Sequence, residues 1–225
     1  NQMINASALD NGLHAGDLKF VDLDGNNKIE QTTSANDRKD MKVIGNSLPR
    51  YNYNFGISAD WYGIDFSVLF QGIGKQNWYP GAETSMFWGP YSRPYASFIP
   101  SDFMSQVWSE ENTNAYFPRP RGYVALGSNR ELAVVNTKYL QNLAYCRLKN
   151  LSIGYTLPDK WLSKIGFEKI RVYFSGENLL TFTKLHSDYI DPEQASASNS
   201  WKTSKSDANI YPWAKTYSFG VDITF

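Results

Sequence analysis

The stretch Trp213-Ala-Lys-Thr-Tyr-Ser-Phe-Gly-Val-Asp-Ile-Thr-Phe225 indicates the fold class of this chain. Apolar and small or polar side chains alternate strictly from residue 217 to residue 225. The apolar set is Tyr217, Phe219, Val221, Ile223 and Phe225, and the other set is Ser218, Gly220, Asp222 and Thr224. A period of two puts each set on its own face of a β-strand. A tilted strand of about ten residues crosses a bilayer, so the stretch predicts a membrane strand.

Residues 50–73 predict a hairpin of two more strands, 50–62 and 63–73. Apolar side chains take the odd positions from Tyr51 to Trp61 and, after a tight turn at Tyr62-Gly63, the even positions from Ile64 to Phe70. Asn, Asp, Ser and Gln take most of the alternate positions. Long strands joined by a very short turn are typical of membrane barrels, whose short turns lie on the periplasmic side.

Two further strands are expected at 142–157 and 168–181. Leu151 to Leu157 alternates cleanly, whereas Arg147 and Lys149 share the parity of Leu151. A β-bulge near Lys149-Asn150 would return Leu148 to the apolar face. The apolar face of the five strands is expected to contact lipid through residues that include Phe55, Phe66, Val68, Val172 and Val221.

The composition suits this reading and excludes other classes. The 225 residues carry 22 basic and 22 acidic side chains, so no net charge favours nucleic acid. The chain is 16% aromatic and 42% hydrophobic, with a mean hydropathy of -0.46, a mixture expected where strands face lipid on one side and water on the other. No run reaches the ~18 apolar residues of a spanning helix, and the first residues do not resemble a signal peptide. The lone Cys146 is expected to be an ordinary strand residue.

Two long connections, 74–140 and 184–211, have no sustained period. The first is rich in Gly, Pro and aromatic residues, and only Ser101 to Ser109 resembles a short helix, with Ser101 as its N-cap. Its rings either bury one another to hold a large loop together or contact a ligand or a partner protein. The candidates for contact are Trp78, Tyr79, Trp88, Tyr91 and Tyr95.

Residues 1–49 contain a motif that resembles a calcium loop. Asp22, Asp24 and Asn26 fall at positions 1, 3 and 5 of such a loop, and the Lys28 carbonyl falls at position 7. Position 6 is Asn27, which tolerates the left-handed conformation, and position 12 is Thr33, which is not an acid. A later carboxylate, Asp37 or Asp40, would then complete a Ca²⁺ site. The alternative is a turn rich in Asp and Asn without metal.

Several segments together resemble the C-terminal part of SusC/RagA-type TonB-dependent outer-membrane transporters of the Bacteroidota. They are residues 16–25, Val43-Ile-Gly-Asn-Ser-Leu-Pro49, Arg147-Leu-Lys-Asn-Leu-Ser-Ile-Gly-Tyr-Thr-Leu-Pro158, Arg171-Val-Tyr-Phe-Ser-Gly-Glu-Asn-Leu-Leu-Thr-Phe182 and residues 217–225. The resemblance implies an all-β fold, a transmembrane antiparallel barrel of 22 strands in the full-length family, with about five of those strands here. It also implies that a terminal aromatic signal, here Tyr217, Phe219 and Phe225, is read by the barrel-insertion machinery.

The family resemblance further implies an importer of glycans or peptides in the outer membrane. A plug and TonB box outside this chain would couple it to TonB, and a SusD-like surface lipoprotein would cover the lumen. Residues 1–49 and the loops 74–140 and 184–211 would then be extracellular. Because barrels of this kind have an even number of strands, five strands predict a fragment.

Two other classes of function compete with an importer. A soluble, calcium-stabilised carbohydrate-binding β domain would also explain the rings and the acidic loop. An enzyme is disfavoured, because neither a nucleophile with its base nor a placed pair of carboxylates stands out in the sequence.

Overall fold

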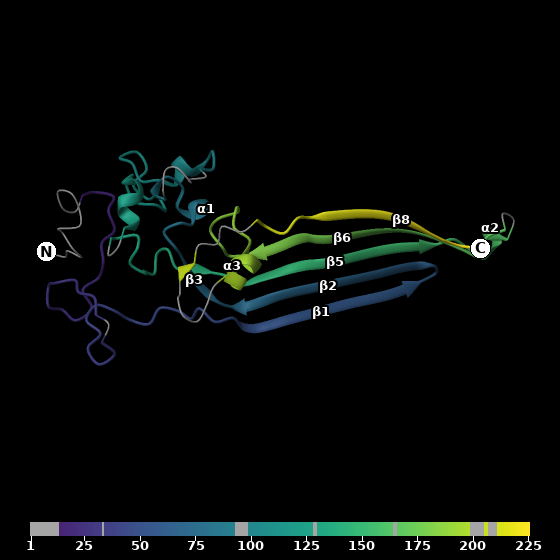
Figure 1. Ribbon diagram of the computed structural model, residues 1–225, viewed down its shortest axis with the longest axis horizontal. Coiled ribbons are helices and arrows are strands. Elements are labelled where there is room, and N and C mark those ends of the chain that lie inside the picture. The colour runs from purple at the N-terminus through teal and green to yellow at the C-terminus, as the bar shows by residue number, and fades with distance from the viewer. Residues whose placement is uncertain are drawn as a thin grey trace.

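The computed structural model describes residues 14–32, 34–92, 99–127, 130–163, 166–198, 205–206 and 211–225. Five long strands form one antiparallel sheet, and most of the remaining residues gather at one end of it (Figure 1). The strands are β1 (Arg50–Trp61), β2 (Ile64–Lys75), β5 (Tyr145–Thr156), β6 (Lys169–Thr183) and β8 (Thr216–Thr224). The fold is therefore all-β in its main body, with five strands where the alternating pattern predicts them.

The strands lie in the order β1-β2-β5-β6-β8, and each pairs antiparallel with its neighbour. Their register brings apolar residues into line across the sheet. One row contains a residue from every strand: Ala59, Phe66, Ile153, Phe174 and Phe219. The residues expected to contact lipid share this face, since Phe55 pairs with Phe70, Val68 with Leu151, and Val172 with Val221.

The expected bulge is present in β5. Against β2, the register passes from Asn150 directly to Leu148, so Lys149 has no partner there. Leu148 consequently faces the apolar side, opposite Phe70 and Leu180. On β6 the same irregularity includes Asn178 in the left-handed region at φ 53°, a conformation that Asn tolerates. Cys146 lies on the N-terminal side of the bulge as an ordinary strand residue, paired with Gly72 and Phe182.

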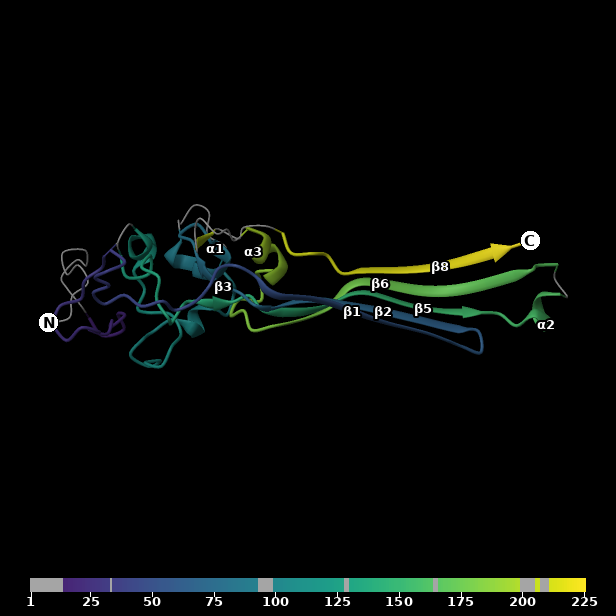
Figure 2. The same ribbon diagram turned by 90° about the horizontal axis from the view of Figure 1, so that it is seen from below.

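The connections divide between the two ends of the sheet. The β1–β2 turn and the connector with the short helix α2 (Asp159–Leu162) lie at one end, together with the C-terminus (Figures 1 and 2). The long connections, which carry α1 (Ser85–Trp88) and α3 (Pro192–Ser198), lie at the other. Gly63 adopts φ +83° in the tight turn, a conformation that favours glycine.

The long connections fold into a compact region with its own core, which we call the loop region (residues 14–49, 76–144 and 184–213, where described). It contains the short strands β3 (Asn77–Pro80), β4 (Gln141–Asn142) and β7 (Lys205–Ser206), joined as a small sheet. Its 3₁₀ turns are η2 (Gly89–Tyr91), η3 (Phe103–Gln106) and η4 (Gly122–Leu126). The short helix expected over Ser101 to Ser109 is present only as the 3₁₀ helix η3, and its expected N-cap at Ser101 is wrong. Asp102 rather than Ser101 precedes η3, without a capping side-chain bond.

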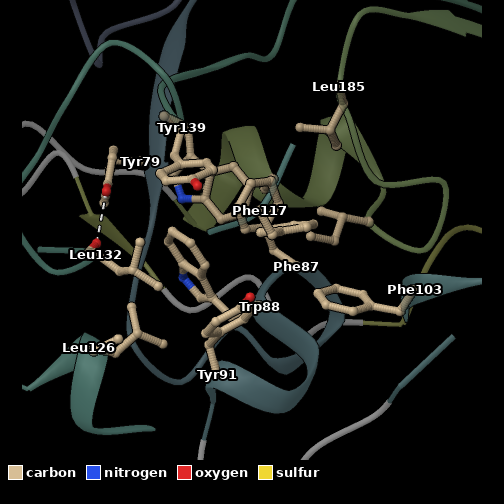
Figure 3. Close-up of a cluster of buried hydrophobic side chains, with 14 of the residues drawn as sticks. Tyr79, Phe87, Trp88, Tyr91, Phe103, Phe117, Leu126, Leu132, Tyr139 and Leu185 are labelled. Carbon is tan, nitrogen blue, oxygen red and sulfur yellow. Dashed lines mark hydrogen bonds between the residues drawn. The ribbon is translucent and has the colours of Figure 1, made fainter. Parts of the chain in front are cut away.

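Buried aromatic side chains form the core of the loop region (Figure 3). Phe117 lies at its centre, with ring centroids 4.7 Å from Phe103 and 5.9 Å from both Tyr91 and Tyr139. The polar atoms of these buried rings form hydrogen bonds, as is usual for buried polar groups. Tyr79 donates to the Leu132 carbonyl at 2.7 Å, and the Trp88 indole N–H donates to the Gly81 carbonyl at 3.0 Å.

No helix among the described residues is both long and apolar enough to cross a membrane.

Candidate functional site

The polar face of the sheet is lined by small hydroxyl groups. A single row runs across all five strands and consists of Ser58, Ser67, Ser152, Ser175 and Ser218. Each of these serines is the sequence neighbour of a residue in the apolar row of Ala59 and Phe66. The two rows show that the alternation along every strand is in phase across the sheet. The sheet therefore separates an apolar surface from a continuous polar one.

Near the short-connection end, Arg171 joins four strands across the polar face. Its guanidinium donates to Asp65 on β2 at 2.8 and 2.6 Å and to Asp222 on β8 at 3.2 Å. The side chain crosses β5 at Gly154, where a Cβ would collide with the Asp65 carboxylate and the Arg171 guanidinium. Gly154 thus makes room for a bidentate ion pair between strands that are not neighbours. No single pattern in the sequence indicated this network.

Most of the aromatic residues proposed to contact a ligand or a partner are buried. Trp78, Tyr79 and Trp88 are 0% exposed and Tyr91 is 1% exposed, because they form the core of the loop region. For these four residues the prediction of direct contact is therefore wrong, and the alternative, in which the rings bury one another, describes the structure. Tyr95 lies outside the described residues.

Other apolar side chains are exposed on the loop region. Met104 is 60% exposed, Tyr123 58% and Tyr211 90%. Smaller exposed fractions belong to Ile99, Val124, Tyr189 and Trp213. Sequence reasoning missed these residues, because exposed and buried rings look alike in a stretch without a period.

A buried ion-pair network anchors the second long connection to the sheet. Arg147 on β5 is 2% exposed, and its guanidinium donates to Asp191 at 2.6 Å and Glu193 at 2.7 Å. Asp191 also accepts the backbone N–H of Trp213 at 3.2 Å, just before β8. Lys149, the bulge residue, lies within 3.3 Å of Glu193 and 5.2 Å from the Trp213 ring centroid. One arginine thereby holds both ends of the 184–211 connection against the sheet.

The acidic loop brings three of its predicted metal ligands together. Asp22, Asp24 and Asp40 each offer a carboxylate oxygen within 4.8 Å of the other two. Asp40 reaches this position because it accepts the backbone N–H groups of Leu23 at 2.6 Å and Glu30 at 2.7 Å. These hydrogen bonds, with that from Glu30 the stronger influence, hold the pKa of Asp40 below its ordinary value.

The other predicted ligands of the acidic loop differ in position. Asp37 forms a salt bridge with Lys39 at 3.4 Å and lies outside the carboxylate cluster. The Asn26 side-chain oxygen accepts the backbone N–H of Lys28 at 2.8 Å, as in an Asx turn. Asn27 takes the left-handed conformation, φ 63°, expected at its position. The arrangement of Asp22, Asp24 and Asp40 fits a hard cation with oxygen ligands. The Lys28 carbonyl stays a predicted further ligand.

A groove of about 550 Å³ lies beside the acidic loop. One wall is formed by residues 18–23, 29–31 and 40–44, and the other by residues 133–138. Most of its lining is apolar, and we call the following apolar lining residues the floor: Leu18, Ile29, Met41, Ile44, Val134 and Val135. Its volume falls within the range of about 300 to 1,000 Å³ that is usual for ligand sites.

Comparison with known proteins identifies relatives of the chain. It is 32% identical over 212 residues to TonB-dependent receptor P3 of Formosa agariphila, a match that covers 92% of this chain and 19% of the relative. It is 26% identical over 227 residues to TonB-dependent receptor P26 of the same organism, covering 99% of this chain and 21% of the relative. The chain is a segment of a TonB-dependent receptor. No family model matches it.

Solved structures agree on the fold of this receptor segment. The RagAB peptide importer in its open-open state superposes with a TM-score of 0.58 at 21% identity, covering 92% of this chain and 20% of that chain. Its closed-closed state gives a TM-score of 0.57 at 23% identity, covering 91% and 20%. The chain thus spans about a fifth of the length of the proteins it matches.

The receptor fold assigns an environment to each face of the sheet. TonB-dependent receptors are β-barrel proteins of the outer membrane, so the apolar row meets lipid and the serine row lines the lumen. Tyr217, Phe219 and Phe225, the predicted insertion signal, lie on or just beyond β8 and are 61%, 82% and 81% exposed in this chain. Their recognition by an insertion machinery remains a prediction.

Proposed function

We propose that this segment supplies part of the barrel wall and of the extracellular surface of a TonB-dependent importer. The observation that carries the proposal is the distribution of the connections. Both long ones fold at one end of the sheet into a region with its own aromatic core, and both short ones lie at the other end. Because short connections of outer-membrane barrels are periplasmic, the loop region belongs outside the cell.

The proposed importer takes up glycans or oligopeptides with energy supplied through TonB, which would act on parts of the receptor outside this segment. RagAB, whose fold this chain shares, is by its name a peptide importer. Support for a surface lipoprotein partner of the SusD type comes from RagAB, in which a SusC-like protein is paired with RagB. It also comes from the exposed apolar residues of the loop region, since large exposed apolar areas mark interaction surfaces. No catalytic residue is proposed.

Topology is tested by labelling single cysteines in the full-length receptor on intact cells. Glu110 and Lys184 are exposed in the loop region, and Ser163 is exposed at the opposite end. In a Cys146→Ser background, cysteines at 110 and 184 should react with an impermeant maleimide, and one at 163 should react only after lysis. Labelling at 163 alone would contradict the topology.

Uptake is tested with a strain that lacks the receptor gene. The full-length receptor should restore growth on one class of nutrient, glycans or oligopeptides, and only when TonB is present. Copurification from detergent-solubilised membranes tests the lipoprotein partner. Growth that is independent of the receptor on both classes would contradict the importer.

We further propose that the acidic loop binds a structural Ca²⁺ ion. Three carboxylates within 4.8 Å of one another repel unless a cation lies between them. The hydrogen bonds that described residues donate to Asp22 and Asp24 come from backbone N–H groups and the Asn26 side chain. The ion would stiffen residues 22–40, which form one wall of the groove.

A further inference from the structure

The groove beside the acidic loop combines four properties that together describe an occupant. Its floor is apolar, its lining carries lysines, backbone groups of its walls make no hydrogen bond with other described residues, and aliphatic side chains in and beside it are exposed.

Three lysines line the groove: Lys19, Lys42 and Lys138. Within the described part of the chain, none of them forms a salt bridge. The two acids of the lining are already engaged. Glu30 lies 3.8 Å from Lys39, and Asp40 accepts two backbone N–H groups in the acidic loop. The groove therefore offers positive charge to an acidic ligand.

The wall segments 18–21 and 42–45 belong to no helix or strand. Backbone N–H and C=O groups of residues 18–21 and 42–45 make no hydrogen bond with any other described residue. Backbone groups need partners when they are covered. An extended peptide supplies both donors and acceptors at the spacing of a strand, which is how peptides bind to open strand edges.

Aliphatic side chains in and beside the groove are exposed. Val21, in the groove lining, is 68% exposed, and Val43, between the lining residues Lys42 and Ile44, is 78% exposed. Exposed aliphatic side chains beside an apolar groove favour burial by a macromolecule. Phe20 is the one aromatic residue in the lining, which disfavours a sugar that would stack on rings.

We propose that this groove receives an extended, acidic segment of a protein partner at the cell surface. The segment binds through main-chain hydrogen bonds to residues 18–21 or 42–45, places an apolar side chain on the floor, and pairs its carboxylates with Lys19, Lys42 and Lys138. The inference rests on the proposed extracellular position of the loop region. It adds to that proposal the place and the chemistry of one contact.

The test uses the full-length receptor with a photo-crosslinking amino acid at Val21, an exposed residue of the groove lining, in intact cells. Matched controls carry the crosslinker at Met104, which is 60% exposed in the loop region outside the groove lining, and at Trp161, which is 62% exposed at the opposite end. Val21 should give one protein adduct, and mass spectrometry should map it to a segment with several Asp or Glu residues. Met104 and Trp161 should not give an adduct with that segment.

Two further measurements test whether the adduct depends on the lysine charges and on main-chain hydrogen bonds. Reversal of the three lysines (Lys19→Glu, Lys42→Glu and Lys138→Glu) should lower the yield of the adduct about tenfold or more, since each exposed pair contributes up to ~1 kcal/mol. Replacement of the same three by Arg should preserve the yield. A synthetic peptide of alternating Glu and Leu should compete, whereas its N-methylated form and a peptide of alternating Lys and Leu should not.

Several outcomes would overturn the proposal. They are no adduct at Val21, an adduct with lipopolysaccharide, glycan or free oligopeptide alone, and a protein adduct unaffected by charge reversal. If a surface partner still copurifies with the receptor in those cases, only the groove assignment fails. If no partner copurifies at all, the proposed partnership fails as well. Unchanged heat-modifiable gel migration of the variants shows that the barrel has folded.

Discussion

Tyr173 on β6 lies across Gly220 on β8, its register partner, so that the ring occupies the space where a Cβ of residue 220 would project. The same ring lies 4.7 Å from the Arg171 guanidinium. The missing side chain at 220 therefore lets the ring lie flat on the neighbouring strand, and the ring and the ion pairs of Arg171 join β6 and β8 in one register.

Gly220→Ala should destabilise the folded barrel by about 1 to 3 kcal/mol, because the added methyl group must displace the ring. The measurement is urea-induced unfolding of the full-length receptor in detergent micelles. Ser218→Ala, two residues away on the same face, is the matched control and should change stability little. In the double variant Gly220→Ala/Tyr173→Ala the cost of the methyl group should disappear, and simple additivity of the two changes would contradict the contact.

Phe66→Arg should lower the free energy of unfolding of the barrel by roughly 2 to 4 kcal/mol if the position lies near the middle of the bilayer. Ser67→Arg should lower it much less. Phe66 faces lipid in the apolar row, whereas Ser67 lies in the serine row of the lumen. Refolding into lipid vesicles at increasing urea measures both variants. Equal costs, or a larger cost at position 67, would show that the faces are inverted.

Arg147→Met should release the 184–211 connection from the sheet, because Asp191 and Glu193 lose a buried partner. Breaking a buried ion pair by removing one partner typically costs about 3 to 5 kcal/mol. Limited proteolysis should then cut this connection faster than in the unaltered protein. Lys149→Met is the control, since its salt bridge is less buried and should matter less; equal cutting rates in the two variants would contradict the anchoring role of Arg147.

His186 should make the packing between the two long connections sensitive to acid. Its ring stacks on Tyr116 with centroids 3.7 Å apart, and loss of hydration there holds its pKa below the ordinary 6.5, although Asp188 opposes the shift. The fold thus favours the neutral imidazole, and its stabilising contribution is present above pH 6.5 and is lost as the pH falls towards the lowered pKa. Proteolysis of the loop region should accelerate between pH 7.5 and pH 5, and His186→Phe should reduce that acceleration. An unchanged acceleration would remove His186 as the cause.

Removal of calcium should loosen the acidic loop if the proposed ion is present. At a free Ca²⁺ concentration about 100 times the Kd, the ion would stabilise the folded loop by about 2.7 kcal/mol. Calorimetric titration of the full-length receptor should show a site that Asp24→Asn abolishes. Asp37→Asn is the matched control, because Asp37 lies outside the carboxylate cluster and pairs with Lys39. Equal binding by both variants, or none by the unaltered protein, would contradict the site.

The membrane strands could be predicted from the sequence because their period depends on local chemistry alone. The strand expected at 50–62 is observed at Arg50–Trp61, and the one expected at 168–181 is observed at Lys169–Thr183. The bulge at Lys149 was also predictable, since a break in parity within one strand has few structural explanations.

The roles of side chains in the long loops could not be predicted in the same way. Trp78 and Met104 lie in the same connection without a period, yet the first is buried and the second exposed. Which residues are covered there depends on contacts between distant segments, such as Leu185 packing in the core with Phe87. The groove between residues 18–44 and 133–138 has the same origin and left no signal in either segment. In the acidic loop, the sequence spacing correctly predicted that Asp22 and Asp24 lie together. That Asp40 rather than Asp37 joins them depends on how the chain folds back, which the spacing does not reveal.

The extra residue at Lys149 reverses which residues of β5 face lipid. On its C-terminal side, odd-numbered residues such as Ile153 face lipid, and on its N-terminal side, even-numbered residues such as Leu148 do. If Lys149 were instead paired as a regular strand residue and residues 150–156 kept their pairing, Arg147 would turn towards the hydrocarbon and Leu148 towards the lumen. The cation that anchors the extracellular connection would then face lipid, where a charge is least tolerated. The bulge at this one position therefore determines which medium each side chain of residues 145–148 meets.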